Sequence, residues 1–173
     1  MSFEIAQSLN RLLESGFEQV RFRHTDKDPG VYIAPQFFIG AVPPRRKNND
    51  PLHEERESNY PFICTRIVTG EDRDDHSLIS LETICGTYTA EDDEAGHNEI
   101  ANMMMRSRRL ILEKQMLDNR FKLVLPLTWS IGDPREDHAQ PHPNYEGIIK
   151  TTWNLPVIER TPTLKEEKDI YGA

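Results

Sequence analysis

The strongest pattern in the sequence is an alternation between residues 121 and 131. Large apolar residues occupy every odd position of this stretch: Phe121, Leu123, Leu125, Leu127, Trp129 and Ile131. A period of two is typical of a β-strand that buries one face and leaves the other in water. We therefore expect a strand over 121–131, with Phe121, Leu125 and Trp129 on its buried face.

Further strands are expected on both sides of this one. The stretches 62–68 and 78–88 are rich in β-branched residues, and apolar residues alternate again over 149–155. Shorter extended segments are expected at 20–23 and 37–42. One-sided alternation favours an antiparallel sheet whose second face is solvated or used for contacts.

Two helices are expected from apolar residues at helical spacing. The first covers 2–15 and ends near Gly16, and the second covers about 98–117, after Gly96. Two helices can cover one face of a sheet. The sequence therefore predicts an α+β domain over 1–160: a mainly antiparallel sheet of about four to six strands with two helices packed on one face.

Most of the cysteines and methionines in the expected strands and the second helix are expected to lie in the core of this domain. Cys64 and Cys85 lie in apolar β-like runs and are expected to be buried thiols. In the second helix, Met103 and Met104 are expected to face the core, whereas Met105 is expected at an interface.

Two polar segments are expected to stay outside the core. Residues 43–59, PPRRKNNDPLHEERESN, contain too few apolar groups to fold alone and predict a long mobile loop. Arg45, Arg46 and Lys47 in this loop are candidates for docking on an acidic partner surface. Residues 161–173 predict a flexible C-terminal tail.

The overall charge narrows the range of partners. Lysine and arginine total 21 against 29 acidic residues, for a net charge of −8. Such a chain repels phosphate, so we expect neither sequence-specific nucleic-acid binding nor binding to anionic membranes. No apolar run approaches the roughly 20 residues of a membrane span. The first residues lack the features of a secretion signal, so folding in a cytoplasm is expected.

Two acidic turns bracket the expected strand over 78–88. Their carboxylates are candidates for a protein interface or for the wall of a channel: Asp72, Asp74 and Asp75 in the first turn, and Asp92, Asp93 and Glu94 in the second. In a channel wall they would repel the phosphates of passing DNA. The alternative is that they only keep the strand ends solvated. Neither turn has the order of carboxylates, glycine and closing glutamate of a calcium loop.

No motif of an active site is present. The sequence contains neither a phosphate-binding GxxxxGK[ST] loop nor a GxSxG nucleophile turn. His138 and His142 have a spacing that suits zinc on a helix, but Pro141 and Pro143 forbid a regular helix there. We therefore expect a protein that binds other proteins, with no enzymatic activity, metal or cofactor.

Several strings in order resemble one family. PFICTRIVTGEDRDD is followed by a strand ending in ICGTY, a Met- and Arg-rich helix, FKLVLPLTWSI and NYEGIIKTTWNLP. Over about residues 1–160 this order resembles the tail terminator, or tail completion, proteins of long-tailed bacteriophages and prophages.

The resemblance implies an α+β fold that forms a ring, commonly a hexamer, on the end of the tail tube. Such a ring stops tube growth and provides the head-joining surface, so the tail tube protein and a head–tail connector protein are the expected partners. The implied location is the virion tail, with assembly in the host bacterial cytoplasm. Two alternatives stay open: another head-completion subunit, or a small metal-dependent hydrolase or nuclease that uses the acidic turns.

Overall fold

The structure of the protein is a computed structural model, which describes residues 2–24, 30–43, 59–73, 75–89, 93–132 and 143–156. Its elements in chain order are α1 (Ser2–Phe17), β1 (Phe22–Arg23), β2 (Tyr32–Ile33), β3 (Gln36–Ile39), β4 (Phe62–Asp72), β5 (Ser77–Tyr88), α2 (Asp93–Lys114), β6 (Met116–Leu117), β7 (Phe121–Ile131) and β8 (Asn144–Leu155). Except for residues 43 and 59, the predicted loop 43–59 lies outside the described residues, as does the predicted tail 161–173.

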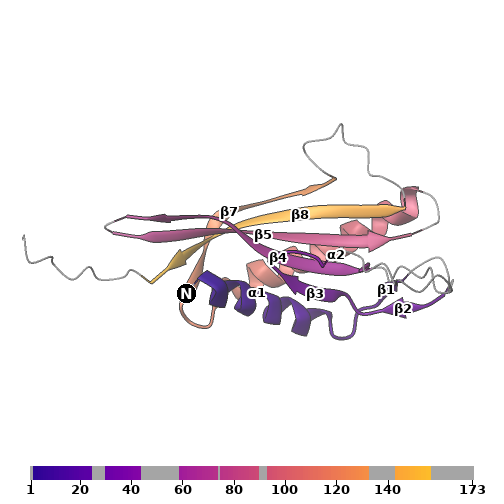
Figure 1. The fold of residues 1–173 in the computed structure, drawn as a ribbon, viewed down its shortest axis with the longest axis horizontal. Coiled ribbons are helices and arrows are strands. Elements are labelled where there is room, and N and C mark those ends of the chain that lie inside the picture. Colours follow the sequence, from indigo (N-terminus) through magenta and orange to yellow (C-terminus); the bar gives the residue numbers. More distant parts are fainter. Residues whose placement is uncertain are drawn as a thin grey trace, which may run out of the picture.

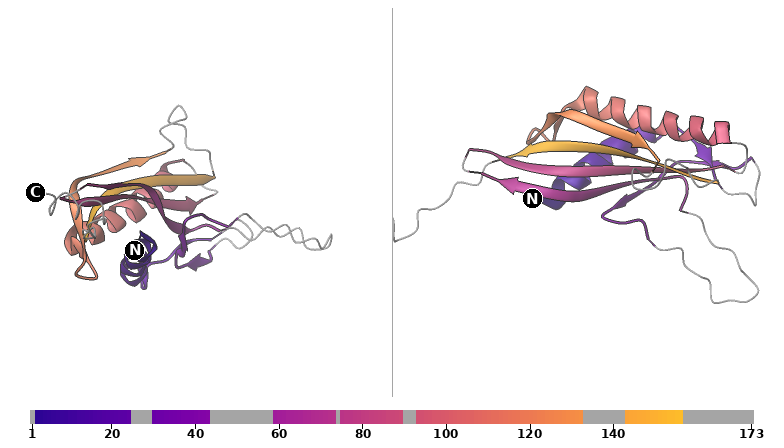
Figure 2. Two further views of the ribbon diagram at one scale, coloured as in Figure 1. Left: turned by 60° about the vertical axis from the view of Figure 1, so that its left-hand side comes forward. Right: turned by 90° about the horizontal axis from the view of Figure 1, so that it is seen from above.

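Six of the strands form one sheet in the order β3-β4-β5-β8-β7-β6. Only β3 and β4 run parallel, and all other neighbours in this sheet are antiparallel. β1 and β2 form a separate two-stranded sheet. Both helices lie on the same face of the large sheet (Figures 1 and 2). The predicted α+β class, with a mainly antiparallel sheet and two helices on one face, is confirmed.

The core lies between the helices and the central strands β5 and β8. On these two strands the odd-numbered residues face the helices, as the burial of Leu81, Ile149 and Trp153 shows. From the helix side, the buried stripe of α2 contributes Met103 and Met104 as expected, whereas Met105 is exposed. The apolar stripe of α2 and the odd-numbered residues of β5 and β8 thus form one apolar layer.

The ends of the helices differ from the prediction, because two glycines expected at helix ends lie inside helices. A Cβ atom at Gly16 would lie 2.2 Å from a methyl carbon of Leu110, so this glycine lets α1 and α2 approach closely. A Cβ atom at Gly96 would lie 2.2 Å from the ring of Tyr145. These positions therefore need glycine for packing rather than for termination.

The second helix also begins and ends earlier than predicted. It begins at Asp93 and ends at Lys114, so Leu117 lies in β6 instead of in the helix. Gln115 follows the helix with a φ of 50°, a left-handed conformation that turns the chain into β6. The short strand then pairs with the start of β7, as Leu117 lies opposite Phe121.

The prediction for β7 is right for its first half and wrong for Leu125 and Trp129. Phe121 is buried, but Leu125 is 64% exposed and Trp129 is 46% exposed. Between Val124 and Thr128 the ladder with β8 is interrupted, since β7 advances four residues while β8 advances only two. Leu125 lies in this irregular stretch. Trp129 points to the helix side, but α2 packs mainly over β5 and β8 and leaves it half open.

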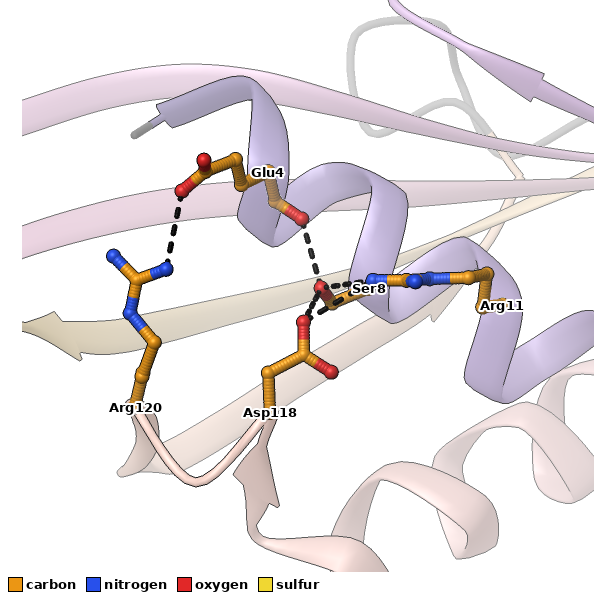
Figure 3. Close-up of polar contacts among 5 residues, drawn as sticks. All are labelled: Glu4, Ser8, Arg11, Asp118 and Arg120. Atoms are coloured by element: carbon orange, nitrogen blue, oxygen red, sulfur yellow. Dashed lines mark hydrogen bonds and ion pairs between the residues drawn. The ribbon is translucent and has the colours of Figure 1, made fainter.

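Polar contacts attach α1 to the turn between β6 and β7 (Figure 3). Asp118 accepts hydrogen bonds from Ser8 and Arg11, and Arg120 lies 3.4 Å from the carboxylate of Glu4. Asp118 has a left-handed φ of 48°, which turns the chain back toward β7. The contacts hold the first half of α1 against the end of the sheet where β7 begins.

The two aromatic residues of β7 should therefore differ in their effect on stability. Phe121→Ala is expected to lower the free energy of unfolding by about 3–5 kcal/mol, since it empties a buried site. Trp129→Ala is expected to lower it by less than about 2 kcal/mol, because half of the side chain is already in water. Urea denaturation of both variants at dilutions at which the chain is monomeric measures the difference, and equal losses would contradict the described exposure of Trp129.

Candidate functional site

The acidic residues of the first predicted turn belong to the hairpin between β4 and β5. Asp72 is still part of β4, opposite Ser77, because the hairpin ladder extends further than the sequence suggested. Its carboxylate accepts a hydrogen bond from the Ser77 hydroxyl. Nδ1 of His76 lies 2.7 Å from the carboxylate of Asp75, and this hydrogen bond lowers the pKa of Asp75. Both carboxylates thus have partners within their own hairpin.

The acidic residues near the second predicted turn lie at the start of α2. Asp93 is its first residue, and Glu94 is exposed in the first turn, where a carboxylate is favoured by the positive end of the helix. The two groups lie at opposite ends of β5, whose 12 residues span about 40 Å at ~3.3 Å per residue.

The structure therefore does not bring the acidic candidates together. Asp74, Asp92 and the basic candidates Arg45, Arg46 and Lys47 lie outside the described residues. The assignment of all these residues to an interface or a channel wall stays a prediction.

The face of the sheet opposite the helices carries a row of charges across three strands. The Nε and Nη2 atoms of Arg66 lie 2.9 and 2.7 Å from one oxygen of Glu82, and Nζ of Lys150 lies 3.4 Å from the other. Glu82 is only 7% exposed, whereas both cations reach solvent. The row therefore consists of two solvent-exposed cations, Arg66 and Lys150, on either side of the buried carboxylate of Glu82.

Two opposing effects act on the pKa of Glu82. Burial favours the neutral form and raises the pKa, but hydrogen bonds and charges from Arg66 and Lys150 favour the ionised form more strongly. The net result is a pKa below the ordinary value of 4.5. Glu82 is therefore ionised at neutral pH and holds the two cations in place.

The same open face is apolar at one end. Tyr60, Phe62 and Cys64 are buried there in a small cluster, and the hydroxyl of Tyr60 donates a 2.6 Å hydrogen bond to Glu146 on β8. A Cβ atom at Gly86 would lie 2.2 Å from the Phe62 ring, so the ring lies directly on the strand.

The most unusual feature of the surface is the edge of the sheet formed by β7. β6 covers only the first residues of β7, and no strand of the described chain pairs with its outer edge beyond Leu123. Leu125 and Trp129 are exposed along this stretch. An uncovered strand edge with large apolar side chains is a typical site for pairing with another chain.

The opposite edge of the sheet is formed by β3. There β3 lies beside α1, and the side-chain amide of Asn10 donates a 3.2 Å hydrogen bond to the carbonyl oxygen of Phe38. The side chain of Asn10 in turn accepts a hydrogen bond from the hydroxyl of Thr65, at 2.9 Å. α1 therefore packs over the face of β3 and β4 next to this edge.

Sequence reasoning missed both the charged row and the apolar edge. One signal was available for the edge, because Pro126 lies in the middle of the alternating stretch. Proline has no backbone N–H and is confined to edge strands or bulges of a sheet. Recognising this would have marked β7 as an edge strand with an irregular centre.

The prediction that both cysteines are buried thiols is confirmed. Burial raises the pKa of Cys85 to about 12, although a contact with the Ser107 hydroxyl lowers it slightly. Burial also raises the pKa of Cys64, against the opposing charge of Arg66. Both thiols are therefore protonated at neutral pH and poorly reactive.

In the described part of the chain, no three His, Cys, Asp or Glu side chains are grouped in a way that could hold a metal ion. None of its helices has the length and apolar character needed to cross a membrane.

Comparison with known proteins does not assign the chain to a family. No protein-family model matches the sequence, and no curated protein matches it significantly.

The charged row should make a measurable, pH-dependent contribution to stability. Glu82→Gln is expected to lower the free energy of unfolding at pH 7 by about 1–3 kcal/mol, since it removes a buried, hydrogen-bonded charge. A lowered pKa in the folded state stabilises it above the unfolded-state pKa, and this stabilisation is lost as pH falls through the folded-state pKa. The stabilities of the variant and the wild type should therefore converge once the pH falls below the folded-state pKa of Glu82, which itself lies below 4.5.

The matched control is Glu14→Gln, at an exposed position of α1, which should leave stability unchanged. Denaturation curves at several pH values provide the measurement. A Glu82→Gln deficit that persists unchanged at low pH would show that the ion pairs are not its cause.

Proposed function

We propose that this chain is a structural subunit that assembles into a ring on the end of the tail tube of a long-tailed phage or prophage. In this role the ring stops growth of the tube and provides the surface to which the head is joined. One structural observation carries the self-assembly part of the proposal, namely the uncovered apolar edge of β7. The resemblance of the sequence to tail terminator proteins supports the specific role.

The β7 edge supports assembly for a physical reason. An uncovered edge with large apolar side chains is an aggregation hazard in a monomer. When the edge of each copy contacts a different surface of the next copy, the contact is repeated around an axis and can close into a ring. Closure leaves no copy with a free edge, so assembly stops at a defined size.

The exposed apolar side chains of the β7 edge are also free to pack against another chain, because they are not fully packed within their own. Leu125 is 64% exposed and lies where the ladder with β8 is interrupted, so it has little packing to lose. Trp129 combines a large apolar area with an indole N–H, and tryptophan is enriched among the residues that dominate binding energy at interfaces.

Substitution of this edge should separate assembly from folding. Leu125→Glu and Trp129→Glu are expected to convert the oligomer to a monomer, because they place charges in an apolar contact. Both variants should stay folded, since the two side chains are exposed in the single chain. Light scattering coupled to size-exclusion chromatography measures the mass, and circular dichroism measures folding.

Phe3→Glu is the matched control, because Phe3 is also a large exposed apolar residue but lies on α1. It should leave the mass of the oligomer unchanged. A wild-type chain that stays monomeric both at high concentration and on purified tail tubes would contradict the proposed ring.

The specific role requires a separate experiment. Particles made without this chain are expected to carry overlong tails without heads, because nothing ends tube growth. Electron microscopy of such particles measures tail length. Tails of normal length that fail to join heads would instead indicate another connector role and would contradict the terminator assignment.

A further inference from the structure

We propose that the ring forms by strand addition, with residues 124–131 of β7 in one copy pairing with residues 66–72 of β4 in the next. The inference rests on the proposed function, since it names the two surfaces that join the copies. The partner is a second copy of this chain, because the two uncovered edges that the contact needs are both present in it.

The second uncovered edge belongs to the outer half of β4. β3 covers β4 only from Phe62 to Thr65, and the cover ends where the backbone N–H of Gly40 donates a 2.9 Å hydrogen bond to the Thr65 carbonyl oxygen. From Arg66 onward, no described strand lies beside the outer edge of β4. On β7, the corresponding limit is the 2.8 Å hydrogen bond from the Leu123 N–H to the Gln115 carbonyl oxygen.

Both uncovered edges expose large apolar side chains. On β4, Ile67 is 40% exposed and Val68 is 48% exposed, in a hairpin that extends beyond the helices (Figure 1). On β7 the exposed residues are Leu125 and Trp129. Large apolar side chains at an open strand edge favour contact with another chain, so Ile67 and Val68 on one edge and Leu125 and Trp129 on the other favour mutual contact.

The strand directions allow the two edges to pair. Three antiparallel steps separate β4 from β7 through β5 and β8, so β4 and β7 run in opposite directions. Rotation about an axis roughly along the strands preserves these directions. The β7 edge of one copy therefore meets the β4 edge of the next in antiparallel orientation, and the alternation of the sheet continues across the junction.

The ladders also define how the two edges align along the strands. Residues 66–72 of β4 lie opposite residues 77–82 of β5, whereas residues 124–131 of β7 lie, through β8, level with residues 80–85 of β5. The two free edges are thus offset by three residues (80 against 77, and 85 against 82). A closed barrel of strands requires an offset of this kind, since its strands are inclined to the axis.

The direction of the side chains selects one register near this offset. We count the shift between copies as the number of β5 residue levels by which the β7 residue lies above or below the β4 residue that it faces. Directly opposite residues point to the same face of a sheet, so this shift must be an even number. A shift of two places Ile67 opposite Trp129 on the helix side and Thr69 opposite Thr128 on the open side. It also leaves the irregular stretch 125–127 facing Gly70, which has no side chain to clash with it.

A disulfide between introduced cysteines tests this register. Thr69→Cys combined with Thr128→Cys preserves Ile67 and Trp129 and places the two thiols opposite each other at the junction. Within one copy these positions are three strand spacings apart, roughly 14 Å at ~4.8 Å per strand. A disulfide needs Cα atoms within about 4.4–6.8 Å, so any bond between these positions joins two copies. Under mild oxidation the full-length variant should give a ladder of covalent oligomers on a non-reducing gel.

Two controls make the result specific. Thr69→Cys with Ser130→Cys corresponds to a shift of four residues and should give at least tenfold less of the ladder. Thr69→Cys alone reports any bonding through the native Cys64 and Cys85, both of which are buried.

The possible outcomes separate this inference from the proposed function. Rings of the expected mass that give no ladder would overturn edge pairing and leave the ring itself standing. A ladder from the Thr69→Cys and Ser130→Cys pair alone would overturn the stated register. A chain that is monomeric in solution and on tail tubes would overturn the ring and the edge pairing together.

Discussion

The packing of two helices against a single face of one sheet determines both what this protein buries and what it leaves exposed. α1 and α2 cover β4, β5 and β8, and the buried side chains of these elements form one continuous core. The helices leave Leu125 and Trp129 of β7 exposed, and the hairpin of β4 and β5 projects beyond them. Because strand edges need partners for their backbone groups, the stretches of β4 and β7 that no described strand covers define where another chain can bind.

The open face of the sheet depends on polar chemistry instead of helix cover. Glu82 is buried in this face without an apolar layer above it, and Arg66 and Lys150 supply the opposite charges that make its burial tolerable. At one end of the face, Tyr60 and Phe62 lie over Gly86 and Glu146 and close a smaller apolar cluster. Helix packing thus stabilises one face of the sheet, and ion pairs with a small apolar cluster stabilise the other. Neither protects the edges of the sheet.

Much of this fold could be predicted from the sequence, because period-two and helical patterns report burial directly. The predicted strand over 78–88 and the first helix agree with β5 and α1 to within two residues at each end. The misplaced end of α1 and the misplaced start of α2 have a common cause, since a glycine needed for close packing has the same sequence appearance as a glycine that ends a helix. Gly16 and Gly96 differ from terminating glycines only through Leu110 and Tyr145, which are distant in the sequence.

The candidate site at the β7 edge was harder to predict from the sequence, because it depends on which strand lies at the edge of the sheet. The alternation that makes Phe121 buried continues unchanged through Trp129, and only the order of strands in the sheet shows that α2 does not cover the second residue. The pairing of Arg66 with Glu82 likewise depends on the register of β4 against β5. The periodicity of apolar residues along the sequence reveals neither the order of the strands in the sheet nor the register between them.

Hydrogen–deuterium exchange of the assembled and the dilute chain tests most directly whether copies join through their strand edges. Assembly should slow exchange of the backbone amides in residues 66–72 and 128–131, since these amides would gain partners across the junction. The amides of β5 and β8, already paired on both sides, should change little. Slower exchange confined to the helices, with no change in residues 66–72 and 128–131, would contradict assembly through the edges of the sheet.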